Sequence, residues 1–396
     1  VAWAGTNSFY DEDEWIELYN KTSKPINLNN WTLYSQSDFE PYINLSGTIP
    51  AKGYYLIERT DDNTVSDIPA DWKGSFGSSE GGGSGLNNSG EVLVLSYAST
   101  TIDQTILGSN DRWPEGTEGR TMERYDPDLA GNIVSNWGTN NMLIRSGKTA
   151  GPQFWDINGT AKARNSVNYL IVKTGSNINS DLTLTKSKSP YIIANDATII
   201  QASATLTIEP GVVIKFYGGG MLVLGKIIAK GTADEPVVFT SFNDDEYGGD
   251  TNNDATSTIP ISGSWFGVDI LSDDSTFDHT IFRYGGKWYN GMGNSMANLS
   301  IKDASAAISN SVFEYSKVYG LRLINSNSNV SKSVFSNNEF GLDSQNSSPT
   351  IQSNAFRNNR QGLYLGYSRG VIDSNIFESN SLAGLSSAGY LSDFTN

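Results

Sequence analysis

Residues 243–254 (NDDEYGGDTNND) are the most acidic stretch of the chain and the first candidate for chemistry. Between residues 231 and 282 there are 11 Asp or Glu and no Lys or Arg. Carboxylates this close together repel one another, and a hard cation such as Ca²⁺, which takes oxygen ligands, would neutralise them. Asp250, Asn252 and Asp254 have an i, i+2, i+4 spacing that suits such an ion. The predicted ligands are Asp244, Asp245, Asp250, Asn252 and Asp254.

The same stretch does not follow the EF-hand pattern, because position six lacks Gly and position twelve lacks Glu. A solvated acidic loop without an ion is the alternative interpretation.

Residues 267–283 offer a second kind of chemistry. There the chain's single histidine, His279, lies beside Asp278 and near Arg283. Together with Asp269, Asp273 and Asp274 they could form an acidic cluster that cleaves glycans. We favour the alternative that this segment is one unit of a structural repeat, with Arg283 paired to Asp278. We therefore predict no catalytic residues.

Aromatic residues near loops are candidates for stacking on sugar rings. Trp265, Trp288 and Tyr289 are the predicted glycan-binding residues, with Phe266 beside them. The alternative is that these side chains cover the body of the fold.

Composition excludes several classes of protein. The 396-residue chain has a net charge of −16, which disfavours nucleic acids and anionic membranes as partners. It has no cysteine, so disulfides and thiolate-zinc sites are excluded. No run of 18 apolar residues predicts a membrane span. Forty glycines and an aromatic content of 11% favour short strands and turns.

Residues 1–166 predict a β-domain. Residues 13–20 (DEWIELYN) alternate polar and apolar side chains as a half-buried strand does, and further strands follow at sandwich-like intervals. This segment, with the runs NWTL at 30–33, TMER at 121–124 and NGTAKARNS at 158–166, resembles the bacterial lamin-tail domain. The resemblance implies an immunoglobulin-like β-sandwich of a secreted protein, used as an accessory module. Val1 lies inside an apolar run, which suggests a trimmed start.

A repeat of about 21 residues dominates the C-terminal half. Phe313, Phe335, Phe356 and Phe377 are spaced by 22, 21 and 21 residues, and each is followed by a Gly-Leu pair. Asn338, Asn359 and Asn380 recur three residues after the phenylalanine. One coil of such short strands cannot bury its own apolar side chains, so equivalent residues must stack between coils. We expect asparagine ladders at the corners, and glycines at corners where φ is positive.

The repeat resembles the right-handed parallel β-helix family, the fold of pectate lyases and many surface proteins. Acidic loops similar to residues 243–254 recur in related β-helices, which favours the Ca²⁺ interpretation. The predicted architecture is all-β: a β-sandwich at 1–166, a polar linker at 167–190 and a parallel β-helix at 191–396. The last coil ends near residue 391, so its open end is expected to need further chain or a partner.

The predicted function is that of an extracellular or cell-surface structural or adhesive protein, such as a surface layer (S-layer), appendage or glycan-binding scaffold. Ca²⁺ is the expected cofactor. The expected partners are further copies of the chain, cell-surface partners or a polysaccharide. A Ca²⁺-dependent polysaccharide lyase or glycoside hydrolase is the alternative, and a lateral groove with clustered carboxylates would favour it.

Overall fold

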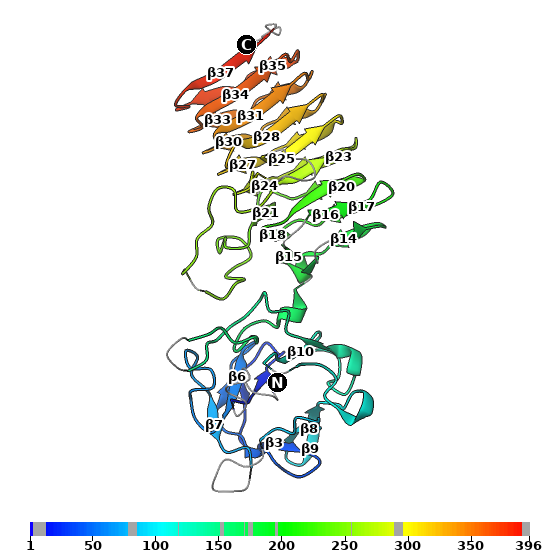
Figure 1. The fold of residues 1–396 in the computed structure, drawn as a ribbon, viewed down its shortest axis with the longest axis vertical. Coiled ribbons are helices and arrows are strands. Elements are labelled where there is room, and N and C mark those ends of the chain that lie inside the picture. Colours follow the sequence, from blue (N-terminus) through cyan, green and yellow to red (C-terminus); the bar gives the residue numbers. More distant parts are fainter. Residues whose placement is uncertain are drawn as a thin grey trace. The chain divides into compact units, whose positions relative to one another are not determined.

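The computed structural model divides the chain into two compact units, of which the first comprises residues 1–168 and 252–255 and the second residues 169–251 and 256–396. It describes residues 1–2, 13–77, 85–117, 119–150, 154–169, 171–172, 177–194, 197–254, 256–288 and 296–389. Figure 1 shows both units, and each is described by itself below.

The first unit is built from one mixed sheet, one antiparallel sheet and two short strand pairs. One sheet has the order β1 (Trp15–Tyr19), β6 (Tyr54–Arg59), β7 (Trp72–Gly74), with β7 parallel to β6. The other has the order β4 (Tyr42–Asn44), β3 (Trp31–Ser35), β8 (Leu93–Tyr97), β9 (Thr100–Gln104). The short pairs are β2 (Ile26–Asn27) with β5 (Thr48–Ile49), and β10 (Met122–Arg124) with β11 (Trp137–Thr139). Single 3₁₀ turns are η1 (Ser109–Asp111), η2 (Val134–Asn136) and η3 (Ser166–Asn168). Ile16, Leu33 and Ile57 lie in a core packed from both sheets, as the predicted sandwich requires.

Glu123 explains why distant motifs of this unit occur together. Its buried carboxylate accepts hydrogen bonds from Asn140 Nδ2 at 2.7 Å, Thr160 Oγ1 at 3.0 Å and Ser166 Oγ at 2.6 Å. A buried carboxylate is tolerated when its oxygens are satisfied in this way. The runs at 121–124 and 158–166 are therefore joined through one side chain.

The second unit is a parallel β-helix of three sheets (Figure 1). Each described coil contributes one strand to each sheet, except the last, which has strands in sheets 1 and 2. Sheet 1 contains β12 (Ile171–Val172), β15 (Tyr191–Ala194), β18 (Val213–Tyr217), β21 (Val237–Ser241), β24 (Thr280–Arg283), β27 (Val312–Glu314), β30 (Val334–Ser336), β33 (Ala355–Arg357) and β36 (Ile376–Glu378). Sheet 2 contains β13 (Asn177–Ile178), β16 (Ala197–Ile200), β19 (Gly220–Val223), β22 (Val268–Ile270), β25 (Ala297–Lys302), β28 (Tyr319–Ile324), β31 (Phe340–Gln345), β34 (Gln361–Gly366) and β37 (Ala383–Ala388). Sheet 3 contains β14 (Leu182–Leu184), β17 (Thr205–Ile208), β20 (Lys226–Lys230), β23 (Ser275–Asp278), β26 (Ala306–Ser309), β29 (Asn329–Ser331), β32 (Thr350–Gln352) and β35 (Val371–Asp373).

The polar linker predicted at 167–190 is wrong. These residues carry β12, β13, β14 and the 3₁₀ turn η4 (Lys186–Lys188). Strands β12, β13 and β14 pair in parallel with β15, β16 and β17, respectively, so they form the first coil. Composition does not reveal the first coil, because a terminal coil stacks on only one neighbouring coil. It therefore carries more polar side chains than the coils that follow.

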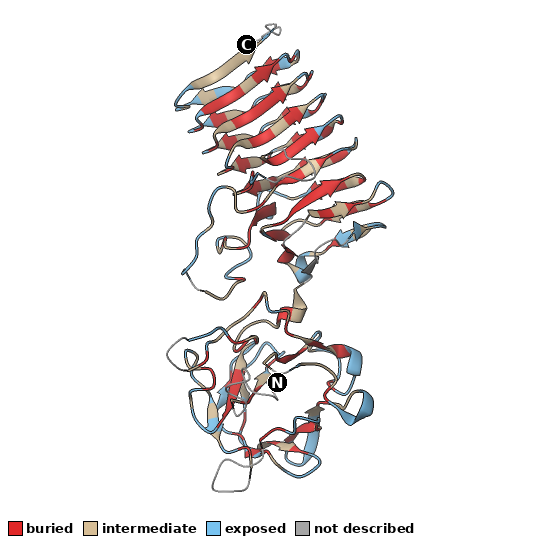
Figure 2. Ribbon diagram, in the orientation of Figure 1, coloured by how far each residue is buried: buried red, intermediate tan, exposed pale blue. Residues whose placement is uncertain are grey.

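The predicted stacking register is confirmed. Phe313, Phe335, Phe356 and Phe377 occupy equivalent positions in β27, β30, β33 and β36. Their rings stack in sequence with centroid distances of 5.0, 4.8 and 5.1 Å. In Figure 2 the buried class follows the stacked strands and gives way to intermediate burial in β37. The asparagine ladder also forms: Asn338 Nδ2 donates to Asn359 Oδ1 at 3.1 Å, and Asn359 Nδ2 to Asn380 Oδ1 at 3.1 Å.

The expected role of the repeated glycines is wrong. Gly320, Gly341 and Gly362 lie inside β28, β31 and β34 and do not have positive φ. A Cβ atom on each would come within 2.4–2.6 Å of the carbonyl oxygen of the next glycine in the stack. Close packing between coils is therefore the reason for glycine. The left-handed corners are occupied instead by stacked non-glycine residues, among them Asn310 (φ 49°) and Lys332 (φ 50°).

Candidate metal centre

The acidic segment 243–254 follows β21, and its residues 244–249 lie over the outer face of sheet 1. We call residues 244–250 the acidic strap. Thr240 Oγ1, on β21, donates a hydrogen bond to Asp244 Oδ2, and Lys215 Nζ, on β18, donates to the carbonyl oxygen of Gly249. Equivalent outward positions of successive sheet 1 strands thus hold the strap, because Lys215 pairs in register with Thr240.

Arg283, on β24, forms ion pairs with two carboxylates of the strap. Its side chain is only 6% exposed, and Nη1 lies 2.7 Å from Glu246 Oε2 and 3.7 Å from Asp244 Oδ2. Its Nε lies 3.1 Å from Glu314 Oε1 on β27. Burial opposes the charge of Arg283, but the three carboxylates outweigh it and raise the pKa of the guanidinium. Burial raises the pKa of Glu314, and the charge of Arg283 partly offsets that effect.

Lys215 supplies a second positive charge beneath the strap. The residue is fully buried, and burial lowers the pKa of its ammonium to about 8 against the opposing pull of Asp245, Asp244 and Asp250. The absence of Lys and Arg between residues 231 and 282 suggests that the carboxylates of this stretch are uncompensated. That premise is wrong, because Arg283 and Lys215 reach the strap from strands distant in the sequence.

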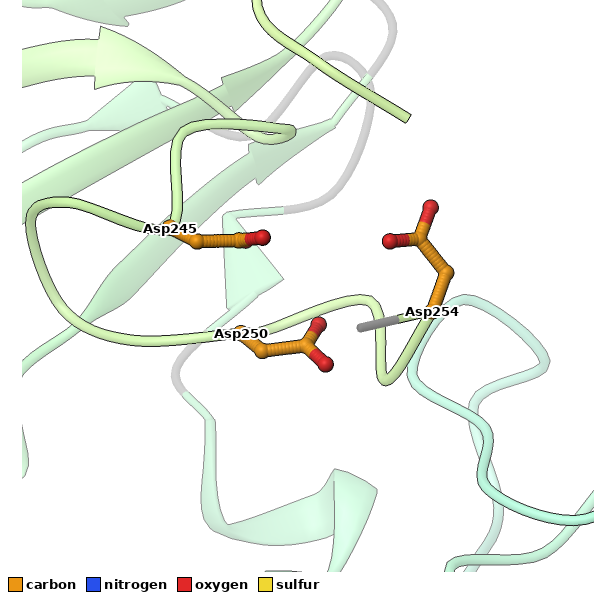
Figure 3. A group of neighbouring side chains, drawn as sticks. All are labelled: Asp245, Asp250 and Asp254. Atoms are coloured by element: carbon orange, nitrogen blue, oxygen red, sulfur yellow. The ribbon is translucent and has the colours of Figure 1, made fainter. Parts of the chain in front are cut away.

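Three carboxylates nevertheless gather in this segment. Asp245, Asp250 and Asp254 each offer an oxygen, and these oxygens lie within 4.8 Å of one another (Figure 3). Among the described residues, these three carboxylates are the group whose oxygens lie close enough together to bind one metal ion. Asn252 lies beside it, since its Nδ2 donates to Asp254 Oδ2 at 2.8 Å.

Asp244 was predicted as a fifth ligand but does not join this group. Its carboxylate accepts from Thr240 Oγ1 and faces Arg283 instead. Spacing alone does not reveal this, because Asp244 and Asp245 are adjacent in the sequence and only the fold directs their carboxylates to different partners. Lys215, Arg283 and Glu314 were missed as contributors to the site. The one available signal was a single charge inside an otherwise apolar strand, as in residues 212–217 (VVIKFY).

The predicted glycan-binding residues do not form one surface. Trp265 is fully buried, with its ring stacked on Phe216 at 4.0 Å and its Nε1 donating to the carbonyl oxygen of Arg283 at 2.9 Å. That prediction is wrong, because the indole fills the interior of the β-helix. Trp288 is 58% exposed, and Tyr289 lies outside the described residues.

The segment around His279 is a regular coil. His279 is a left-handed corner residue (φ 49°) whose N–H donates to the carbonyl oxygen of Ser309 in the next coil. Asp278 accepts from Ser309 Oγ and Asn310 Nδ2, both at 2.7 Å. The Asp278 pair expected for Arg283 is replaced by the contacts of Arg283 with the strap and Glu314.

Comparison with known families agrees with this architecture. Residues 2–108 match the model of the Lamin Tail Domain family. Residues 160–298 match a pectate-lyase like β-helix domain, and residues 251–395 match the right handed β-helix region. The chain is a lamin tail domain followed by a right-handed β-helix. The pectate-lyase-like match begins at 160, so the family models also leave no room for the predicted linker.

Similarity to individual proteins is limited. A stretch of 69 residues is 41% identical to Protein bark beetle of Drosophila melanogaster, covering 17% of this chain and 2% of that protein. No solved structure matches the chain. A β-helix of the pectate-lyase-like kind fits a cell-surface or polysaccharide-related protein, and such domains are usually extracellular. No helix in the described part of the chain is both long and apolar enough to cross a bilayer.

Proposed function

We propose that this chain is a structural or adhesive module of the cell surface, in which the β-helix is a rigid scaffold and not a catalyst. The proposal rests on the contacts made by three of the four acids that a glycan-cleaving cluster would need. Asp273 Oδ1 accepts from the N–H of Ser305 at 2.8 Å, and Asp274 pairs with Lys226 at 3.0 Å. Asp278 is tied to Ser309 and Asn310. These carboxylates brace one coil against the next.

A scaffold of this kind needs coils that do not slip, and the side-chain ladders supply that. The phenylalanine stack and the asparagine ladder both fix the register of neighbouring coils, because a slip by one residue exchanges buried and exposed side chains. Further copies of the chain and other cell-surface components are the partners that we propose for it.

We also propose that the acidic segment 243–254 binds Ca²⁺ through Asp245 and Asp250 of the strap and through Asp254. Charge supports a divalent ion: three carboxylates whose oxygens lie within 4.8 Å of one another repel, and a divalent cation relieves that repulsion. Carboxylate and amide oxygens, as on Asn252, are the ligands that Ca²⁺ prefers. A bound ion would link Asp245, Asp250 and Asp254 and so restrain the strap.

The test of the cation is thermal unfolding of the full chain with 2–5 mM CaCl₂, a concentration on the order of weak extracellular sites, or with EGTA. We expect Ca²⁺ to raise the Tm of the wild type by several degrees. Asp250→Asn should remove this increase, whereas Asp274→Asn, a matched change outside the group, should retain it. A Tm that is equal in CaCl₂ and EGTA would overturn the cation proposal and leave the scaffold proposal standing.

A further inference from the structure

A cluster of exposed aromatic rings lies on the lamin tail domain, in a place that none of the sequence motifs indicated. Tyr34 is on β3, Tyr42 is its paired neighbour on β4, and Phe39 is in the loop between the two strands. The ring centroids lie 5.7 Å apart for Tyr34 and Phe39, 6.1 Å for Tyr34 and Tyr42, and 6.3 Å for Phe39 and Tyr42. Phe39 is 58% exposed and Tyr42 is 56% exposed. Each ring therefore contacts the other two, and two of them present much of their surface to solvent.

The backbone at Phe39 indicates that the ring is not there for stability. Phe39 has φ of 61°, in the left-handed region that a bulky residue rarely adopts and glycine adopts freely. The conformation is fixed locally, because the N–H of Phe39 donates to Ser35 O at 3.2 Å and the N–H of Glu40 donates to Asp38 Oδ1 at 3.0 Å. A position where glycine would be easier thus carries an exposed phenylalanine. Backbone strain combined with an exposed apolar ring is typical of a binding residue.

The size of the cluster points to a small, flat ligand. An aromatic side chain covers about 150–250 Å², so rings exposed by little more than half offer on the order of 200–300 Å² together. A stable protein interface needs about 800 Å² from each partner, so these rings alone are too small for one. One or two pyranose rings are of the right size, and their faces of axial C–H bonds stack on aromatic rings.

The surroundings define the charge of the ligand. Gln36, Ser37 and Asp38 are all exposed next to Phe39, and they offer amide, hydroxyl and carboxylate groups to sugar hydroxyls. The carboxylate and the net charge of −16 would repel a polyuronate. We propose that Tyr34, Phe39 and Tyr42 form a stacking platform for an uncharged polysaccharide on the lamin tail domain. The proposal does not depend on the cation site.

Affinity gel electrophoresis of the full chain tests the platform. The probes are hydroxyethyl cellulose, galactomannan and laminarin as uncharged polymers, and polygalacturonate as the charged comparison. Phe39→Gly is the decisive variant, because it removes the ring while relieving the left-handed backbone, so its Tm should equal or exceed that of the wild type. Tyr42→Ala is the second variant. Phe154→Ala is the matched control, since Phe154 is 59% exposed in the same unit and is not among these three rings.

We expect at least one uncharged polymer to retard the wild type and Phe154→Ala equally. Phe39→Gly and Tyr42→Ala should each bind that polymer at least tenfold more weakly than the wild type does. Retardation of the wild type by none of the uncharged polymers would overturn the proposal. So would equal retardation of Phe39→Gly, or stronger retardation by polygalacturonate than by every uncharged polymer. Self-association that Phe39→Gly abolishes, measured by light scattering without any glycan binding, would assign the rings to a protein contact and also overturn it.

Discussion

At the scale of single residues, buried aromatic stacking is the clearest source of stability in the β-helix. Phe356 is fully buried between Phe335 and Phe377, with ring distances of 4.8 and 5.1 Å. Phe377 belongs to the same ladder but is only partly buried. The two positions therefore share chemistry and register and differ in burial.

Phe356→Ala should lower the free energy of unfolding by about 3–5 kcal/mol, because it leaves a cavity and removes two ring contacts. Phe377→Ala should cost markedly less. Urea unfolding of both variants, followed by circular dichroism, measures the difference. A loss of less than about 1 kcal/mol for Phe356→Ala would be inconsistent with the stacked register.

Also at the residue scale, Glu58 on β6 predicts a dependence of stability on pH. The residue is fully buried. Burial raises the pKa of its carboxyl from 4.5 to about 7, against the lowering effect of the backbone N–H groups of Val65 and Thr64. Between these two pH values the folded unit keeps a proton that the unfolded chain has released, so stability falls as pH rises.

Glu58→Gln removes this titration. We expect the variant to lose less stability than the wild type between pH 5 and pH 8, by on the order of 2–3 kcal/mol. Asp128→Asn, at a side chain that is 81% exposed, is the control and should follow the wild type. Urea unfolding at the two pH values makes the comparison. Parallel behaviour of Glu58→Gln and the wild type would mean that Glu58 is already ionised in the folded state.

At the scale of elements, the distance between coils decides which side chains a strand can carry. Gly341 in β31 has the carbonyl oxygen of Gly362 only 2.5 Å from the position of an added Cβ. Gly218, by contrast, has nothing within 4 Å of such an atom, although its φ is 75°.

Gly341→Ala should therefore push neighbouring coils apart and cost about 1–3 kcal/mol or more, as other cases of overpacking do. Gly218→Ala carries only the left-handed backbone penalty of about 1–2 kcal/mol. Thermal unfolding ranks the two, and amide hydrogen exchange locates the effect. Exchange that accelerates in β31 and β34 for Gly341→Ala alone is the expected result. Unchanged exchange there would contradict the packing explanation for the repeated glycines.

At the scale of the whole molecule, each unit has a hydrophobic core of its own. Among the described residues, one core cluster runs through the coils, from Leu184 to Ile372. Two others, one around Leu33 and one around Leu56, belong to the lamin tail domain. Separate cores allow separate unfolding.

Scanning calorimetry at pH 8 should show two transitions. We expect Phe356→Ala to lower the temperature of one of them and Glu58→Gln to raise that of the other, because each change lies in a different core. If both variants moved both transitions by similar amounts, the units would unfold as one cooperative body.

The sequence alone determined the repeat, and the reason is that stacking imposes a strict period. Phe313, Phe335 and Phe356 must occupy equivalent places in successive coils for any of them to be buried, so their spacing is visible without a structure. The first coil, β12 to β14, could not be predicted in this way. Its composition is polar, because a terminal coil needs fewer apolar side chains.

Only the tertiary structure decided which charges meet and which aromatic rings are exposed. Asp250 and Asp254 are close in the sequence, so their proximity could be predicted from spacing. Lys215 and Arg283 reach the acidic strap from β18 and β24, about 30–40 residues away, because parallel coiling brings equivalent positions of distant strands together. Trp265 faces the interior while Phe39 faces solvent, although both are aromatic residues in loops. Burial depends on what packs across the fold, and no local pattern in the chain records that.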